Sequence, residues 1–176
     1  MRSLAWSAVE EEEGLRVLPE AGTPRFSRGL GILVVESHSL VGAALARLLG
    51  GSPLEAVVET VPDVASAMAV LEGSDFDLVV CELSASSRNT AALVSKLQSL
   101  RRDVPIALLS SVEEEQLLLD ALTSGATGFF TKDCAPEDFL DGLSSVLRGH
   151  YTVSKKLKPG VMARLTGAKK ASAATR

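Results

Sequence analysis

The sequence predicts an α/β fold in which five strands alternate with five helices and pair as a doubly wound, five-stranded parallel sheet. Short, continuous apolar runs such as residues 31–35 and 105–109 are typical of strands that helices cover on both faces. A segment with apolar residues at helical spacing follows each run, and Gly or Pro marks most of the boundaries. Because parallel strands need crossover connections, this alternation favours a parallel sheet.

The first strand and helix show the pattern most clearly. Residues 31–35 form the predicted strand, and the helix follows over residues 39–49, where Gly50 and Gly51 end it. Apolar residues recur along the helix at a spacing of three to four. They predict an inward stripe that consists of Leu40, Ala43, Ala44 and Leu48.

The same alternation continues to residue 148. The remaining predicted strands span residues 56–60, 78–81, 105–109 and 128–131. The remaining predicted helices span residues 62–71, 89–100, 112–124 and 136–148. Pro62 and Pro136 suit the starts of two of these helices, because the first helical position needs no backbone donor.

Composition and charge divide the chain into three parts. Residues 1–29 carry an acidic run and no sustained period, which predicts a mobile leader. Residues 30–149 form the predicted domain. Residues 150–176 form a basic linker and tail, with seven Lys or Arg and no acidic residue from residue 154 onward. Because basic tails can bind nucleic acid, contact with DNA is a weaker alternative for this segment.

Several classes of protein are disfavoured by the sequence. No apolar run approaches the roughly 18 residues of a membrane span, and residues 10–13 are all Glu where a secretory signal needs apolar residues. We therefore expect a cytoplasmic protein. Cys81 and Cys134 stand in no metal-ligand spacing, and no nucleophile–base pair or phosphate-binding glycine loop is evident. We expect no enzyme activity.

The residues that follow the strands are the candidates for function. In open parallel sheets, ligands bind beyond the carboxyl ends of the strands. The residues at these ends are Glu36 and Ser37 after the first strand, Glu82 after the third, Ser110 after the fourth and Lys132 after the fifth.

Four segments resemble the CheY-like receiver domains of LuxR/NarL-type response regulators. Residues 32–41, ILVVESHSLV, resemble the first strand, where the family has two acids and then His-Pro-Leu. Residues 77–84, DLVVCELS, resemble the strand that carries the phosphoacceptor aspartate. Residues 104–110, VPIALLS, and 125–133, GATGFFTKD, resemble the fourth and fifth strands. The resemblance spans about 120 residues with the family's spacing, and it implies a flavodoxin-like (βα)5 fold.

The resemblance also implies roles for individual positions. Glu82 stands where the family has its phosphoacceptor aspartate, and Lys132 stands on the family's lysine. Ser110 and Phe129 fall on the switch hydroxyl and the switch aromatic. The family's acid pair is here Glu36 and Ser37, so one charged ligand for Mg²⁺ is missing.

These departures predict an atypical receiver. The extra methylene of Glu82 moves its carboxylate by more than an ångström, and misplacement of about 1 Å can cost two orders of magnitude in rate. We expect little or no phosphorylation, weak or absent Mg²⁺ binding and no other cofactor or metal. The Glu82 carboxylate is expected to pair with Lys132 and the Ser110 hydroxyl. This pairing either imitates the phosphorylated state or only satisfies buried charges. We assign no chemical role to His38, because a lone histidine is more often a surface residue.

We expect signalling by contact with a protein partner or a second copy of the chain. The surface formed by the fourth helix, fifth strand and fifth helix is the one that receivers commonly use. Residues 117–119 are three consecutive leucines, and they cannot all face one core stripe. The residues after 149 resemble the junction to a helix-turn-helix domain, for which too little chain follows. The expected function is an atypical receiver linked to transcription regulation; the alternatives are a conventional phosphorylatable receiver and a small-ligand-binding module.

Overall fold

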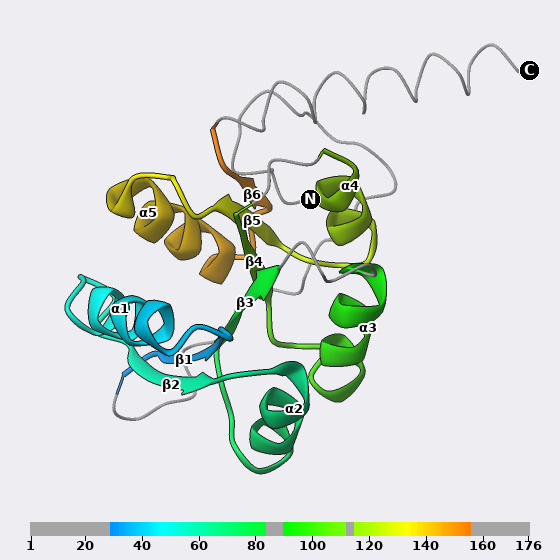
Figure 1. Cartoon of the computed structure of the whole chain (residues 1–176), viewed down its shortest axis with the longest axis horizontal. Helices are drawn as coiled ribbons and strands as arrows, with labels where there is room; N and C mark the ends of the chain where they lie inside the picture. Colours follow the sequence, from blue (N-terminus) through cyan, green and yellow to red (C-terminus); the bar gives the residue numbers. More distant parts are fainter. Residues whose placement is uncertain (1–28, 84–89, 112–114, 156–176) are drawn as a thin grey trace, which may run out of the picture.

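A six-stranded parallel sheet lies at the centre of the protein (Figure 1). It is seen in a computed structural model that describes residues 29–83, 90–111 and 115–155. The strands are β1 Gly31–Val35, β2 Val57–Val61, β3 Leu78–Leu83, β4 Ile106–Ser110, β5 Gly128–Thr131 and β6 Thr152–Val153. Their order in the sheet is β2-β1-β3-β4-β5-β6. The chain order reverses direction between β1 and β3, which makes this the switch point of the fold.

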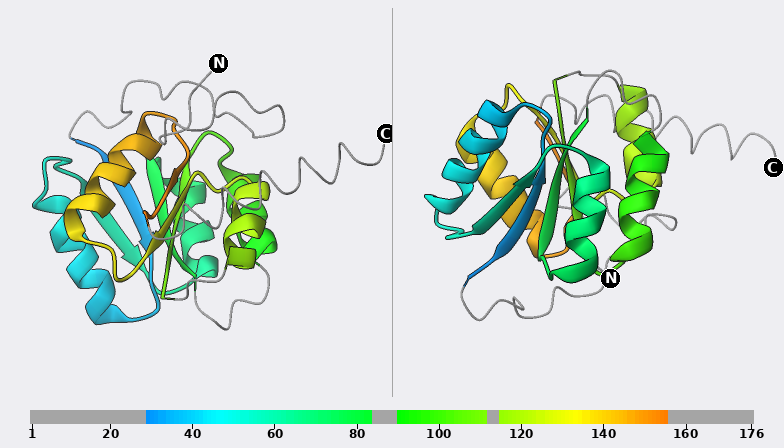
Figure 2. Two further views of the ribbon diagram at one scale, coloured as in Figure 1. Left: turned by 90° about the horizontal axis from the view of Figure 1, so that it is seen from above. Right: turned by 60° about the horizontal axis from the view of Figure 1, so that its bottom comes forward.

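Five helices cover the two faces of the sheet (Figure 2). They are α1 Ser39–Gly50, α2 Val64–Gly73, α3 Thr90–Leu100, α4 Glu115–Thr123 and α5 Pro136–Leu147. Buried residues of α2, α3 and α4 share one core cluster, and buried residues of α1 and α5 share the other. The doubly wound α/β fold predicted from the sequence is therefore confirmed.

The strands explain why the sequence showed continuous apolar runs. Along β1, Leu33 contributes to the cluster beneath α2, α3 and α4, while Ile32 and Val34 contribute to the cluster beneath α1 and α5. Along β5, Phe129 and Phe130 divide in the same way. A strand that is buried on both faces needs an apolar residue at every position.

The orientation predicted for the first helix is wrong. Leu40 is 82% exposed, and Ala43 and Ala44 are exposed with it. The residues that α1 buries are Gly42 and Leu49, and Leu45 and Leu48 pack partly against the same core. Apolar residues occur on every side of this helix, so their spacing did not identify the inward side.

The sheet has one strand more than the five predicted. β6 lies in the segment that we expected to be a linker, and it pairs in parallel with the edge of β5, with Thr152 opposite Gly128 and Val153 opposite Phe129. Tyr151 and Val153 are both buried. A strand of two residues is too short to show any period in the sequence.

Close packing of α5 against β5 depends on a glycine. A Cβ atom on Gly142 would lie 2.3 Å from the ring of Phe130. Without that atom, the Phe130 ring meets Phe139 edge to face, with the ring centroids 5.1 Å apart. Near the other end of the sheet, Asp63 caps α2 by accepting a hydrogen bond from the Ser66 amide.

Some predictions concern residues outside the described part of the chain. These are the leader apart from Gly29, most of the basic tail and the start of the fourth helix at residues 112–114. In the described segments, no helix is long and apolar enough to cross a membrane.

Candidate functional site

The strand-end residues gather at the carboxyl edge of the sheet, as their positions in the sequence predicted. The register pairs Val35 of β1 with Cys81 of β3, so that Glu36 lies beside Glu82. Lys132 follows β5, two strands away from β3. Its long side chain crosses that distance and reaches both carboxylates.

Lys132 bridges the two glutamates. Its Nζ atom donates to Glu82 Oε1 at 2.6 Å and to Glu36 Oε2 at 2.8 Å. The side chain of Glu36 is 1% exposed and that of Glu82 is 9% exposed. Carboxylates so deeply buried need a positive partner, and the Lys132 ammonium supplies it. The predicted contact between Glu82 and Lys132 is present, and Glu36 joins it.

Ser37 holds the other oxygen of Glu82. The Ser37 hydroxyl donates to Glu82 Oε2 at 2.8 Å, and the Ser37 amide approaches the same oxygen at 3.4 Å. Glu82 Oε1 is bound by Lys132, so both oxygens of the carboxylate are engaged. The longer side chain of Glu82 thus extends toward the corner where the family resemblance places the second acid.

His38 is also part of the cluster, although the sequence led us to assign it no chemical role. Its Nδ1 atom lies 2.9 Å from Glu36 Oε1, 3.2 Å from the Ser37 hydroxyl and 3.8 Å from Glu82 Oε1. The His38 amide donates to Glu36 Oε1 at 2.9 Å. In the sequence, this role of His38 is indicated only by its position two residues after Glu36, the acid that follows β1.

The ion cluster shifts the pKa of Glu82 and that of Lys132. Burial opposes the charged form of Glu82, but hydrogen bonds from Lys132 and within the cluster outweigh it and lower its pKa to about 2. Burial also opposes the charged form of Lys132, but its hydrogen bonds to Glu36 and Glu82 outweigh this and raise its pKa. The lysine and the Glu82 carboxylate are therefore both charged at neutral pH.

The two predicted switch residues lie within the core. The Ser110 hydroxyl donates to the backbone carbonyl of Leu83 at 3.3 Å, and Ser110 is fully buried at the end of β4. Phe129 is fully buried between Leu108 of β4 and Val153 of β6, its partners in the sheet register. Its ring therefore belongs to the packing beneath α2, α3 and α4.

The two cysteines lie in different surroundings. Burial and the negative charges of Glu82 and Glu36 raise the pKa of Cys81 to about 12. Burial and the charges of Asp133 and Asp138 also raise the pKa of Cys134. Because the thiolate is the reactive form, neither cysteine is primed as a nucleophile.

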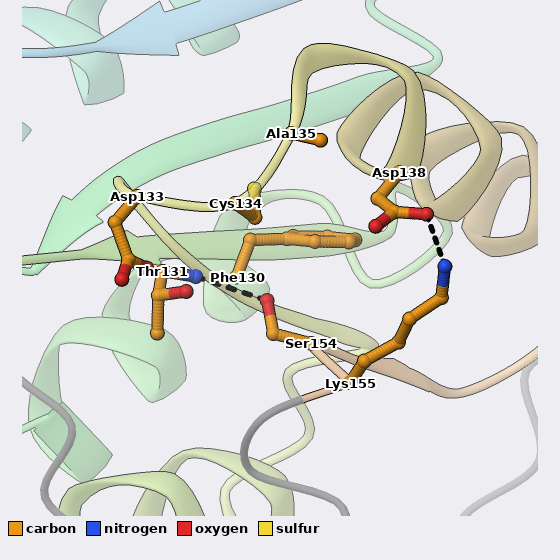
Figure 3. A pocket seen from close by; sticks show the side chains of 8 residues that line it. All are labelled: Phe130, Thr131, Asp133, Cys134, Ala135, Asp138, Ser154 and Lys155. Carbon is orange, nitrogen blue, oxygen red and sulfur yellow. Dashed lines mark hydrogen bonds and ion pairs between the residues drawn. The ribbon is translucent and has the colours of Figure 1, made fainter.

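A small pocket of about 160 Å³ lies between the end of β5, the start of α5 and the residues after β6 (Figure 3). Its lining consists of Phe130, Thr131, Asp133, Cys134, Ala135, Asp138, Ser154 and Lys155. The Thr131 amide donates to the Ser154 hydroxyl across it. None of the three bridged residues Glu36, Glu82 and Lys132 lines this pocket, so the pocket is separate from the cluster at the strand ends.

Comparison with known proteins identifies the family. A family model for the response regulator receiver domain matches residues 32–144, which is more than half of the chain. The chain therefore belongs to the response regulator receiver domain family. The family resemblance seen in the sequence is confirmed.

Several curated relatives are transcription regulators. The chain is 28% identical over 137 residues to the DNA-binding transcriptional activator DevR/DosR of Mycobacterium tuberculosis, covering 78% of this chain and 63% of that protein. It is 27% identical over 134 residues to the nitrate/nitrite response regulator protein NarL of Escherichia coli, covering 76% and 62%. The chain thus spans less than two thirds of the length of these relatives.

Solved structures agree with this assignment. A LuxR family DNA-binding response regulator from Silicibacter pomeroyi matches with a TM-score of 0.63 and 26% identity, covering 73% of this chain and 98% of that one. A CheY-like receiver domain protein from Methanospirillum hungatei matches with a TM-score of 0.60 and 19% identity, covering 67% and 93%. The second likeness supports the fold alone.

Proposed function

We propose that this receiver domain signals without aspartyl phosphorylation, through contact with a protein, in the control of transcription. The observation that carries the proposal is the engagement of both oxygens of Glu82, by Lys132 on one side and Ser37 on the other. A carboxylate must be aligned with the phosphorus before it can attack, and these two contacts hold the Glu82 carboxylate in the position it takes in the ion cluster. The link to transcription rests on the related regulators.

The residues of the site do not suit Mg²⁺. This ion favours near-octahedral coordination by oxygen and is usually held through carboxylates. Ser37 offers a neutral hydroxyl in place of the family's second acid, and the Lys132 ammonium already lies between the two remaining carboxylates. A divalent cation at the same place would meet the repulsion of that ammonium. We therefore derive no phosphoryl transfer through Mg²⁺.

The proposal is tested by incubation of the protein with acetyl phosphate and Mg²⁺, followed by intact-protein mass spectrometry. We expect the wild type to show no phosphoryl adduct. Glu82→Asp alone should stay largely unmodified, because Ser37 still lacks the charge of the missing acid. The double variant Ser37→Asp, Glu82→Asp should gain one phosphoryl group, because it restores the family's residue at both positions.

The wild type, Glu82→Gln and the double variant distinguish the possible causes of the result. A phosphoryl adduct on the wild type that Glu82→Gln removes would show a conventional receiver that tolerates glutamate, and the proposal would be wrong. If the double variant fails to react although its unfolding transition matches that of the wild type, features other than these two positions block the chemistry. An acetyl adduct formed by the reagent differs in mass from a phosphoryl adduct, so the mass spectrum distinguishes the two.

We further propose that the contact surface is formed by α4, β5 and α5. In α4, Leu118 is buried and Leu119 is half-buried. The side chain of Leu117 is not among those that the structure describes. β6 lies along the edge of β5, so this surface is formed by the two helices with β6 between them rather than by a free strand edge. β6 is now the edge strand, and because it is only two residues long it offers little backbone for strand addition, which favours contact through side chains of the helices.

The first partner to test is a second copy of the chain. Sedimentation over a range of concentrations should show a reversible dimer, and Leu119→Glu should weaken it at least ten-fold because a charge enters an apolar contact. Leu40→Glu is the matched control, since Leu40 is exposed on α1, away from α4. Equal weakening by both variants, or a monomer at all concentrations, would contradict a homodimer through this surface.

A further inference from the structure

We propose that the pocket between β5, α5 and the residues after β6 binds a short aliphatic diamine in its diammonium form. Figure 3 shows Asp138 and Lys155 at one end of this pocket and Thr131 and Asp133 at the other. One ammonium group of the ligand pairs with Asp138. The second donates to the Thr131 hydroxyl, and the Asp133 carboxylate balances its charge. The site is separate from the Glu82 cluster, so the proposal does not rest on the proposed loss of phosphorylation.

The hydroxyl of Thr131 is the observation that points to a ligand. Thr131 is 2% exposed and lines the pocket, and its Oγ1 atom has no hydrogen-bond partner among the described residues. Figure 3 shows this hydroxyl on the side of Thr131 that faces Ser154. A buried polar group without a partner costs free energy, and most buried side-chain polar atoms in folded proteins are paired. A molecule in the pocket that donates to Oγ1 supplies the missing partner.

The charges around the pocket select a cation. Asp133 and Asp138 supply two carboxylates and Lys155 supplies one ammonium, so the lining carries a net charge of −1. The negative field extends to Cys134, which also lines the pocket. Burial, and then the charges of Asp133 and Asp138, raise the pKa of its thiol. A pocket lined in this way attracts a cation and repels an anion.

Lys155 shows that Asp138 binds an alkylammonium group. The Lys155 Nζ atom lies 2.5 Å from Asp138 Oδ1, at one end of the pocket. The side chain of Lys155 is 74% exposed and that of Asp138 is 43% exposed, and an ion pair so exposed contributes little to stability. A ligand ammonium can therefore replace that of Lys155 at little cost. The two remaining carboxylates then carry a charge of −2, which a diammonium ion neutralises.

The size and the walls of the pocket suit a short apolar chain between two charged groups. Pockets that bind drug-sized molecules have volumes of about 300–1,000 Å³, and this one is smaller, at about 160 Å³. Phe130 lies between Thr131 and Asp138 and offers its ring to the methylene groups of the ligand (Figure 3). The hydrogen bond from the Thr131 amide to the Ser154 hydroxyl, at 3.1 Å, holds these two walls in place before a ligand arrives.

The test is a titration of the full chain with 1,4-diaminobutane at physiological ionic strength, followed by nuclear magnetic resonance of the backbone amides. We expect saturable binding of one equivalent that shifts the amide resonances of Thr131 and Ser154. Butylamine, which lacks the second ammonium group, should bind about ten-fold more weakly, because it makes no hydrogen bond to the Thr131 hydroxyl.

Four variants locate the ligand. Thr131→Val keeps the shape of the side chain, and it should weaken binding about ten-fold while raising the unfolding temperature of the ligand-free protein, because the unpaired hydroxyl is gone. Asp138→Asn should also weaken binding, whereas Lys155→Met should strengthen it by removing the competing ammonium. Glu137→Gln is the matched control, since Glu137 is exposed on the same turn of α5 and does not line the pocket, and it should leave the affinity unchanged.

Four results would overturn the proposal. The first is the absence of saturable binding. The second is equal affinity for butylamine or for Nα-acetyl-lysinamide, which would indicate the lysine side chain of a partner protein instead. The third is unchanged affinity in Thr131→Val, which would show that water alone serves the hydroxyl. The fourth is equal weakening by Glu137→Gln, which would show unspecific attraction to an acidic helix end. None of these readouts depends on phosphoryl transfer.

Discussion

Lys132→Met is expected to lower the free energy of unfolding at pH 7 by about 3 kcal/mol. The substitution leaves two carboxylates side by side without a cation, and the side chain of Glu36 is almost fully buried. Urea denaturation in buffer with a chelator measures the effect. Lys155→Met is the matched control, because it removes only the exposed ion pair with Asp138 and should change the free energy of unfolding far less than Lys132→Met does.

The effect of Lys132→Met should also depend on pH. The pKa of Glu82 in the folded protein, about 2, lies below its ordinary value of 4.5, so its contribution is complete above 4.5 and lost as the pH falls toward 2. The pKa of Lys132 is raised above 10.5, so its contribution is complete below 10.5 and lost at higher pH.

The difference in the free energy of unfolding between wild type and Lys132→Met should therefore be largest between about pH 5 and pH 10. It should become smaller at lower pH and at higher pH. Unfolding curves at pH 3 and pH 7 suffice for the acidic side. A difference that stays constant over this range, or an equal loss in Lys155→Met, would show that the ion cluster does not stabilise the fold as described.

Phe129→Ala is expected to lower the free energy of unfolding by about 3–5 kcal/mol. Phe129 is fully buried, and removal of its ring leaves a cavity between β4, β6 and the helices above them. Thermal or urea unfolding measures the loss. Leu40→Ala is the control, since Leu40 is 82% exposed and should change stability by less than about 0.5 kcal/mol.

The comparison of these two variants also tests how the first helix is oriented. If Leu40→Ala costs as much as Phe129→Ala, then Leu40 is buried in solution and the predicted inward stripe was right after all. If Phe129→Ala is nearly neutral, the ring is not packed as the structure has it, and a mobile switch at this position regains support.

The order of the elements could be predicted from the sequence alone. Buried strands show as apolar runs: β1 has no polar side chain, and β4 is apolar up to its last residue, Ser110. Gly or Pro stands at most of the boundaries, so both the α/β class and the strand ends were recognisable. Parallel pairing then brings the strand ends to one edge of the sheet. For that reason Glu36, Glu82, Ser110 and Lys132 could be chosen as candidates before any contact was known.

Other features were decided only by the tertiary structure. The inward side of α1 was not predictable, because its apolar residues surround the helix and only packing against β1 and β2 selects Leu49 over Leu40. β6 is stabilised by its pairing with β5, since two residues carry no periodic signal. The contacts of His38 and Lys132 with the glutamates depend on the register of β1, β3 and β5, which brings together side chains up to 96 positions apart.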